Sequence, residues 1–243
     1  LANGCICCVI RSDLISAVLK LADRPERPDH IVIESSGVAD PASVERAFMV
    51  PEVWSRVRYE GVISVVDADQ SFALAAEHGN LAEQQVRSGD LIILNKVDLV
   101  NGEQLAAVRS WIEKIKPGAE ILETSHCSLP TEILLGVQNK SRPTGLPVAI
   151  ENTKTHGHAF ESWSYESSNP LSLYLFQELL KNLPPEIMRA KGFLYTTEKR
   201  HRRLVLQFVG RRATIAVEGE WNGQLPETRL VFIAKSETVN FKA

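Results

Sequence analysis

The 243-residue sequence predicts an α/β fold, a doubly wound and mainly parallel sheet, followed by a small α+β domain. Two observations predict this order. Short apolar runs that end in polar residues alternate with helical patterns along the first half of the chain, and such runs are typical of strands buried on both faces of a parallel sheet. In the last third, a strand and a helix are followed by several strand-like segments, which favours an α+β domain.

The elements of the first half follow from periodicity and from helix stop signals. The helix expected from Gly102 to Lys116 carries one apolar stripe and is stopped by Pro117-Gly118. The other expected elements are a helix at 12–22 and strands at 30–34, 61–67, 91–94 and 120–123. The polar residues at the ends of these strands, Glu34, Asp67, Asn95 and Ser125, should form the ligand site, because ligands of doubly wound sheets bind at the carboxyl ends of the strands.

Turn-forming residues and a change of pattern divide the chain. Residues 1–140 are expected to form the first domain, 141–154 a linker and 155–243 the second domain. In the second domain, Asn169 is the expected N-cap of a helix that begins at Pro170 and runs to about Lys181. The expected strands lie at 158–164, 193–196, 204–209, 214–217 and 229–234.

The bulk composition excludes several classes of protein. A net charge of −3 argues against a nucleic-acid partner, and no apolar run approaches the roughly 20 residues that cross a bilayer. The chain opens without a signal-peptide pattern, and four cysteines are too few for a disulfide scaffold. We therefore expect a cytoplasmic protein without nucleic-acid or membrane partners, and its oligomeric state is left open. The one dense basic run, 199–203, is expected to form a solvated hairpin turn, although an acidic partner could use it.

Asn95-Lys96-Val97-Asp98 directly follows an expected buried strand. The Asp98 carboxylate can accept hydrogen bonds from N1–H and the exocyclic amine of guanine, and adenine lacks these donors. Asn95 would tie neighbouring loops together, and the stem of Lys96 would cover the face of the base. Ser125 follows the next strand, where backbone amides could contact the guanine carbonyl. A polar strand-to-helix turn without a ligand is the alternative interpretation.

Glu34 and Gly37 lie in a loop after the first expected strand, Glu34-Ser35-Ser36-Gly37-Val38-Ala39-Asp40-Pro41. A carboxylate at this place can hold a water of a phosphate-bound Mg²⁺, which keeps much of its hydration shell. Gly37 lets a backbone amide approach a terminal phosphate closely. Taken together with the guanine motif, the loop is interpreted as a sensor of the γ-phosphate, and the alternative is a helix cap and turn.

Cys5, Cys7 and Cys8 form a C-x-C-C cluster, which holds three of the four cysteines. Thiolates suit Zn²⁺ and similar ions, and three of them leave one tetrahedral position open for transfer of the metal. In a regular strand, Cys7 and Cys8 would point to opposite faces, so convergence requires irregular backbone, which Gly4 favours. A redox pair and buried free thiols are the alternatives, and Cys127 is left unassigned.

These motifs together resemble those of the CobW-type GTPases, the cobalamin-synthesis-protein family. The matching segments are 4–8 (G-C-I-C-C), 34–41 (E-S-S-G-V-A-D-P), 61–68 (G-V-I-S-V-V-D-A), 95–98 (N-K-V-D) and the opening of the second domain, 158–165. The resemblance implies a phosphate-loop GTPase that acts as a metal chaperone or insertase. It implies GTP and Mg²⁺ as ligands, Zn²⁺ as the first candidate metal with Co²⁺ and iron behind it, and a client metalloprotein bound by the carboxyl-terminal domain.

One family motif is absent from this chain. No glycine is followed by lysine, so the sequence contains no G-x-x-x-x-G-K-[ST] phosphate loop, which the family places upstream of the C-x-C-C cluster. We therefore expect a preceding segment in a longer protein, and poor nucleotide binding by the chain without it. A non-catalytic metal-binding scaffold and a cysteine redox protein are the rival hypotheses. His156 and His158 are interpreted as the end of the linker and the start of a strand.

Overall fold

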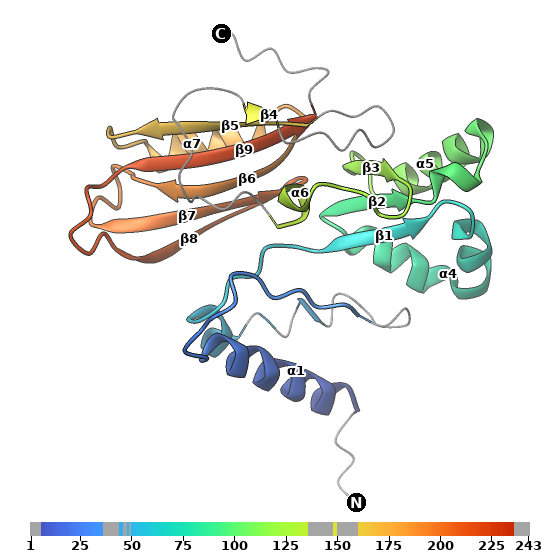
Figure 1. Cartoon of the computed structure of the whole chain (residues 1–243), viewed down its shortest axis with the longest axis horizontal. Coiled ribbons are helices and arrows are strands. Elements are labelled where there is room, and N and C mark those ends of the chain that lie inside the picture. Colours follow the sequence, from blue (N-terminus) through green and yellow to red (C-terminus); the bar gives the residue numbers. More distant parts are fainter. Residues whose placement is uncertain are drawn as a thin grey trace, which may run out of the picture.

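The structure is a computed structural model that describes residues 6–35, 44–45, 48, 50–135, 148–149 and 160–235. Two sheets lie side by side (Figure 1), a three-stranded parallel sheet of order β1-β2-β3 and a six-stranded antiparallel sheet of order β4-β5-β9-β6-β7-β8. The expected class, an α/β sheet followed by an α+β domain, is confirmed. Within the described part of the chain, no helix is both long and apolar enough to cross a membrane.

The first part of the chain carries helices around the parallel sheet. Its elements are α1 (Ile6–Ala22), α3 (Pro51–Trp54), β1 (Ile63–Asp67), α4 (Ser71–Ser88), β2 (Leu91–Asn95), the 3-10 turn η1 (Val97–Leu99), α5 (Gly102–Ile115), β3 (Ile121–Thr124) and α6 (Thr131–Leu135). Ile92 and Leu94 of the central strand are fully buried against Val108 and Ile112 of α5. Asn101 caps α5 with a capping box, as its oxygen accepts the N–H of Gln104 at 2.9 Å.

Two expectations for the first part are wrong. The first helix begins at Ile6 rather than at residue 12, because neither glycine nor proline interrupts the sequence between Ile6 and Ala22. Residues 30–34 form no strand, and Val32 is 77% exposed. The side chain of Ile31 instead packs into a small separate core with Val18 of α1 and Val53 of α3, which holds this segment away from the edge of β1.

The second part is an antiparallel sheet with one helix on it (Figure 1). Its elements are β4 (Val148–Ala149), β5 (Phe160–Ser167), α7 (Leu173–Lys181), β6 (Ile187–Leu194), β7 (Arg202–Val209), β8 (Arg212–Glu220) and β9 (Thr228–Lys235). Phe176 and Leu180 of α7 pack on the sheet in one buried core with Leu204 and Leu206. β4 lies within the expected linker and pairs with β5, whereas the expected domain boundaries remain predictions.

The start of α7 differs from the expectation. Asn169 does not cap it and Pro170 is not its first residue, because Leu171 is held in an extended pairing with the chain at Thr196. The backbone N–H of Leu171 donates to Tyr195 O at 2.9 Å, so the helix can begin only after this bond. Ser172 is the N-cap instead, and its hydroxyl accepts the N–H of Leu175.

A buried core joins the two sheets. Leu91 and Leu122 of the parallel sheet pack against Met188, Val209 and Ile233 of the antiparallel sheet, and all five are at most 4% exposed. Ile133 of α6, which lies between the sheets (Figure 1), completes this core. The two domains are therefore packed together rather than connected by the chain alone.

Candidate functional site

The carboxyl ends of the three parallel strands bring the expected polar residues into one row. In the strand register, Asp67 at the end of β1 lies opposite Asn95 at the end of β2, and Asn95 lies opposite Thr124 at the end of β3. Thr124 is fully buried, and its hydroxyl contacts the carbonyl oxygens of Ser125 and Ser128 at 3.3 and 3.2 Å. The ends of the three strands thus share one edge, as expected for Asp67, Asn95 and the residues before Ser125, whereas Glu34, also expected there, does not follow a strand.

Asp67 anchors Lys96. Lys96 has a left-handed backbone conformation (φ 62°), which turns the chain sharply after β2, and its Nζ lies 2.6 Å from Asp67 Oδ2. Asp67 Oδ1 accepts the N–H groups of Asp69 and Gln70 at 3.0 and 3.1 Å. Although partial burial raises the pKa of Asp67, the hydrogen bonds from Lys96 and the two amides outweigh it and hold this pKa below its ordinary value. The stem of Lys96 is therefore stretched along the sheet edge.

Asn95 holds the loop that follows β3 against the strand ends. Its Oδ1 accepts the backbone N–H of Cys127 at 2.9 Å. His126 and Cys127 both have positive φ angles (55° and 50°), a conformation that costs about 1 kcal/mol or more for each non-glycine residue and persists only where contacts hold it. The bond from Cys127 to Asn95 is such a contact. It places Ser125, at intermediate exposure, beside the end of β2.

Asp98 stands at the same edge. It belongs to the η1 turn, in which Val97 is buried beneath the turn while Asp98 itself is exposed. The N–H of Leu99 donates to Lys96 O at 3.0 Å and closes the turn. The turn therefore fixes the backbone of Asp98 and leaves its side chain on the surface, where a planar ligand lying on the stem of Lys96 would reach it.

The other predicted site residues are not part of this row. Glu34 is exposed in the irregular segment that was expected to be a strand, so it does not lie at a strand end. Gly37 and Cys5 fall outside the described residues. Cys7 and Cys8 lie in α1, so the irregular backbone expected for them is not found there, and their side chains are not described. Among the residues whose side chains are described, no three His, Cys, Asp or Glu residues gather as a metal site.

A partly buried ion-pair cluster connects the Glu34 segment with the second sheet. Its centre is Glu60, in the segment that leads into β1. The Glu60 carboxylate pairs with Arg189 and, at 2.6 Å, with Lys191, and it accepts a hydrogen bond from Gln207 at 3.2 Å. His30, four residues before Glu34, has its Nδ1 3.9 Å from the same carboxylate. Burial raises the pKa of Glu60, but the cations of Lys191 and Arg189 outweigh it and the pKa is lowered.

Replacing Glu60 by alanine is expected to lower the free energy of unfolding by about 3 kcal/mol or more, because it leaves Arg189 as a buried charge without its carboxylate. Arg189 is only 3% exposed, and its remaining contacts are carbonyl oxygens of α6, including Leu134 O at 2.8 Å. Urea denaturation measures the effect. The matched control is Glu178→Ala, which breaks an exposed pair with Lys181 and should cost less than about 1 kcal/mol.

The pH dependence of the Glu60 effect has a defined sign. Since the native pKa of Glu60 is lowered, its contribution is complete above the ordinary value of 4.5 and is lost as the pH falls through the lower native pKa. The variant and the unchanged protein should therefore converge in stability in acid. Equal losses for Glu60→Ala and Glu178→Ala at neutral pH would contradict this account.

A second group of ion pairs, around Arg212, lies in the same region. Arg212 of β8 pairs with Glu45 at 2.6 Å and lies 3.6 Å from Asp90, and its guanidinium stacks 4.8 Å above the centre of the Tyr59 ring. Burial, the largest cause, raises the pKa of Asp90, and the nearby Arg212 charge opposes it. Residues on both sides of the Glu34–Pro41 loop, His30 and Glu45, are thus linked to cations of the second sheet, His30 through Glu60.

Sequence reasoning missed several of these residues. Asp67 was placed at the sheet edge but not recognised as the partner of Lys96, and Cys127 was left unassigned although its backbone holds Asn95. No sequence signal could have paired Glu60 with Arg189, because 129 positions separate them. The spacing of Asp67 and Lys96 at the ends of adjacent strands is the one signal that was available.

The fold and this edge define a class of protein, an α/β domain of the nucleotide-binding kind followed by an antiparallel-sheet domain. The chain belongs to the CobW family: residues 1–123 match the family "CobW/HypB/UreG, nucleotide-binding domain", and residues 160–241 match the "Cobalamin synthesis protein cobW C-terminal domain". The resemblance stated from the motifs is confirmed.

Sequence relatives agree with this membership. The chain is 33% identical to a protein named zinc chaperone CobW from a Sinorhizobium species, over 96% of this chain and 75% of the relative. It is 34% identical to zinc-regulated GTPase metalloprotein activator 1 of Schizosaccharomyces pombe, over 52% of this chain and 31% of the relative. The crystal structure of Zn(II)-bound YjiA GTPase from Escherichia coli overlaps 93% of this chain and 71% of its own, with 23% identity and a TM-score of 0.42.

Proposed function

We propose that the protein is a GTP-dependent metallochaperone, a GTPase that carries zinc on Cys5, Cys7 and Cys8 and delivers it to a client metalloprotein. One observation carries the proposal: the row formed by Asp67, Asn95 and Thr124, with the Lys96–Asp98 turn folded beside it at the carboxyl edge of a parallel sheet. The names of the relatives, zinc chaperone and zinc-regulated GTPase, support the choice of metal and nucleotide.

The proposed nucleotide contacts follow from the chemistry of guanine. Asp98 accepts N1–H and the exocyclic amine, and both bonds become strong when the base shields them from water. Lys96, held at its tip by Asp67, offers its stem to the face of the base. Backbone amides at Ser125 donate to the guanine carbonyl oxygen. Adenine would present the wrong groups to Asp98 and to the amides at Ser125, whereas the stem of Lys96 would cover either base.

The phosphate side of the site rests on the loop that begins at Glu34. Its carboxylate is exposed and can hold a water of Mg²⁺, which would bind the phosphates and neutralise charge during their transfer. Gly37 would bring a backbone amide to the γ-phosphate. Hydrolysis removes that contact, so the loop changes its conformation between the two nucleotide states.

A shared core offers a route from this loop to the thiols. Val18 of α1, the helix that contains Cys7 and Cys8, packs in one cluster with Ile31, three residues before Glu34. A movement of the Glu34 segment therefore changes the packing of α1. With three thiolates on the metal, one coordination position stays open for a ligand of the client. Hydrolysis would thus change the packing of α1 and thereby weaken the coordination of zinc by the three thiolates.

The zinc affinity should depend on the nucleotide. We expect zinc to be bound at least about tenfold more tightly with GTP and Mg²⁺ than with GDP and Mg²⁺, since allosteric couplings are commonly 5–150-fold. Competition with a chromophoric chelator, using the full-length protein, measures both affinities. ATP and ADP are the control pair and should give no difference. A zinc affinity that is the same with GTP and GDP would rule out nucleotide control.

A further inference from the structure

We propose that the client is bound on the face of the second sheet that carries α7, through an apolar strip on this helix and a basic tip at the β6–β7 turn. The occupant is a protein segment in which apolar residues are followed by a cluster of carboxylates. The identity of the partner as the metal-receiving client rests on the function proposed above, whereas the surface itself rests on the contacts described below.

The outer side of α7 is unusually apolar. Phe176 and Leu180 face the sheet and are buried, but Tyr174, Leu175 and Leu179 on the other side are 67%, 66% and 52% exposed. Leu175 and Leu179 are one turn apart and form a single row with Tyr174 beside it. A surface helix normally carries polar residues on its solvent side, so this strip (Tyr174, Leu175 and Leu179) is a candidate contact surface.

The sheet continues the apolar strip on the same face. Leu204 of β7 belongs to the core beneath α7, and Val217 of β8 lies directly opposite it in the strand register. Cross-strand partners point to the same face of a sheet, so Val217 faces the side that carries α7. It is 47% exposed, because the helix does not cover it.

Basic residues predominate around Val217. A hollow of about 630 Å³ is lined by residues 198–202 together with Val217. Lys199, Arg200 and His201 form the exposed basic tip, and within the described part of the chain no ion pair involves their side chains. Arg202 has only a loose contact with Glu220, 3.7 Å between two exposed side chains. The tip therefore presents positive charge around an apolar floor.

The basic tip and α7 are held in a fixed relation. The Glu198 carboxylate accepts the N–H of Leu173 at 2.9 and 3.0 Å and the hydroxyl of Ser172 at 3.2 Å, which ties the turn to the first residues of the helix. The bond from Leu173 is the main reason why the pKa of Glu198 falls to about 2. Trp221 Nε1 donates to Arg200 O at 3.1 Å from the other side. A surface that is already fixed loses little entropy when it binds.

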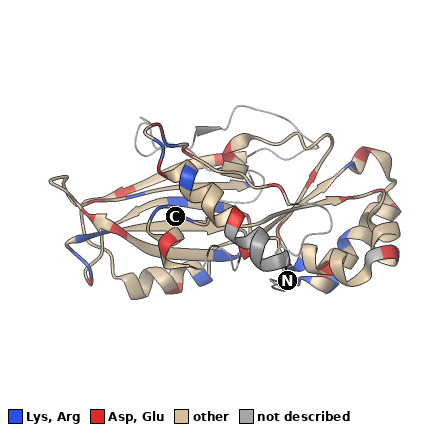
Figure 2. Cartoon of the chain, turned by 90° about the horizontal axis from the view of Figure 1, so that it is seen from below, with Lys and Arg blue, Asp and Glu red and all other residues tan. Residues whose placement is uncertain are grey.

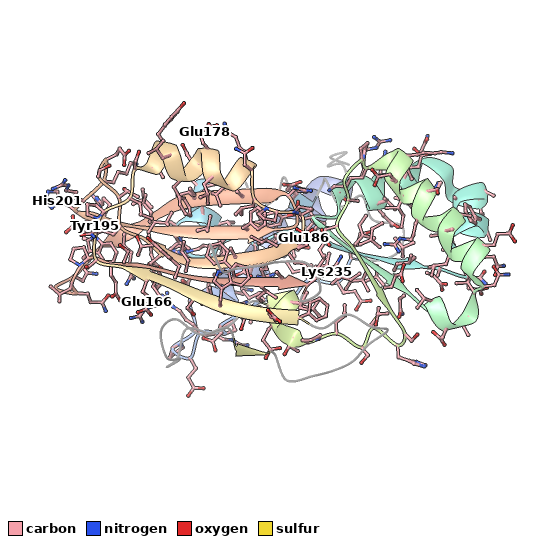
Figure 3. All side chains as sticks on the ribbon, turned by 90° about the horizontal axis from the view of Figure 1, so that it is seen from above. Glu166, Glu178, Glu186, Tyr195, His201 and Lys235 are labelled. Carbon is pink, nitrogen blue, oxygen red and sulfur yellow. The ribbon has the colours of Figure 1, made fainter. Side chains whose placement is uncertain are left out.

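The surface is open to a partner. Figure 3 places His201 at the end of the second sheet that points away from the first sheet, with α7, marked by Glu178, on the adjoining face. In Figure 2, the ribbon of a turn at this same end is coloured blue for Lys and Arg. A client bound here would not compete with the core between the two domains, which lies at the opposite end of the sheet.

The chemistry favours a protein segment over a nucleic acid. Carboxylates of the partner complement Lys199 and Arg200, and its apolar side chains cover Leu175, Leu179 and Val217. A phosphate backbone would match the cations but would leave the three exposed apolar side chains of α7 in water.

The test uses the chain in metal-free and nucleotide-free buffer, so that its result does not depend on zinc or GTP. The probe is a fluorescein-labelled 16-residue peptide with two leucines four positions apart followed by four aspartates, and fluorescence anisotropy gives its dissociation constant. We expect micromolar binding, and at least about tenfold weaker binding of a peptide with asparagine in place of the aspartates. A labelled single-stranded oligonucleotide of similar length is expected to bind more weakly than the acidic peptide.

Two double variants test the basic tip and the apolar strip separately. Lys199→Glu with Arg200→Glu, and separately Leu175→Ser with Leu179→Ser, should each weaken peptide binding at least about tenfold without lowering the melting temperature by more than a few degrees, because all four side chains are exposed. Lys114→Glu with Arg24→Glu is the matched charge control, at exposed positions far from α7 in the sequence, and should leave binding unchanged.

Several outcomes would overturn the proposal. These are equal affinity for the acidic and neutral peptides, unchanged binding by both double variants, tighter binding of the oligonucleotide, or a dimer in light scattering that the leucine variant converts to a monomer. Failure of nucleotide-dependent zinc binding would refute the proposed function while leaving a positive peptide result in place. If zinc binding depends on the nucleotide but the peptide does not bind selectively, only the proposed surface is refuted.

Discussion

Replacing Asp98 by asparagine is expected to lower the affinity for guanine nucleotides by a factor of about 10³ or more. The asparagine amide has only one acceptor oxygen, which can still accept N1–H, but its NH₂ group would face the exocyclic amine of the base, so one hydrogen bond is lost and two donors are left opposed. The same amide can donate to the C2 carbonyl of xanthine, which replaces that amine. The variant should therefore prefer xanthosine to guanosine nucleotides, as measured by competition against a fluorescent nucleotide on the full-length protein.

Asp69→Asn is the matched control for this prediction. It removes the same charge at the same sheet edge, from an exposed residue whose carboxylate accepts a hydrogen bond from its neighbour Gln70. Guanine affinity should be nearly unchanged by it. If Asp98→Asn and Asp69→Asn have equal effects, or if the Asp98 variant shows no gain for xanthine, then the turn at Asn95–Asp98 does not read the base.

Local patterns predicted the elements whose surroundings are also local. The strand at Leu91–Asn95 and the helix at Gly102–Ile115 agree with their expected ranges within one residue. The strand is a continuous apolar run that is buried on both sides, and Asn101 and Pro117-Gly118 mark the helix ends. The Asn95–Asp98 turn could be placed for the same reason, because it follows directly on that strand.

Tertiary contacts decided the elements that were predicted wrongly. Residues 30–34 have the apolar pattern of a buried strand, yet Ile31 packs with Val18 and Val53, and no strand forms. The start of α7 moved to Leu173 because Leu171 pairs with the chain at Thr196. These competing partners lie far away in the sequence, and periodicity contains no information about them.

The links between the domains could not be predicted for the same reason. A lone Glu60 and a lone Arg189 look like ordinary solvated charges in the sequence, and only the folded chain shows one carboxylate shared by Arg189, Lys191 and Gln207. Such clusters connect the Glu34 segment physically with the second sheet. The segment that leads to Glu34 and the sheet proposed to bind the client both contact Glu60.

The second large effect is expected at the thiols. Replacing Cys5, Cys7 and Cys8 together by serine removes every proposed zinc ligand, and serine hydroxyls stay protonated and neutral at neutral pH, so they bind zinc poorly. Binding by several thiolates contributes on the order of 10 kcal/mol at neutral pH, so the loss should reach a factor of at least about 10⁴ in affinity. Cys127→Ser is the matched control, because Cys127 is an exposed free thiol that is not in the cluster.

Zinc titration of these variants against a competing chelator therefore tests the central claim most directly. The account predicts one tightly bound zinc ion per chain in the unchanged protein and in Cys127→Ser, and none in the triple variant, with melting temperatures in the absence of metal that agree within a few degrees. Tight stoichiometric zinc binding that survives the loss of Cys5, Cys7 and Cys8 would contradict it.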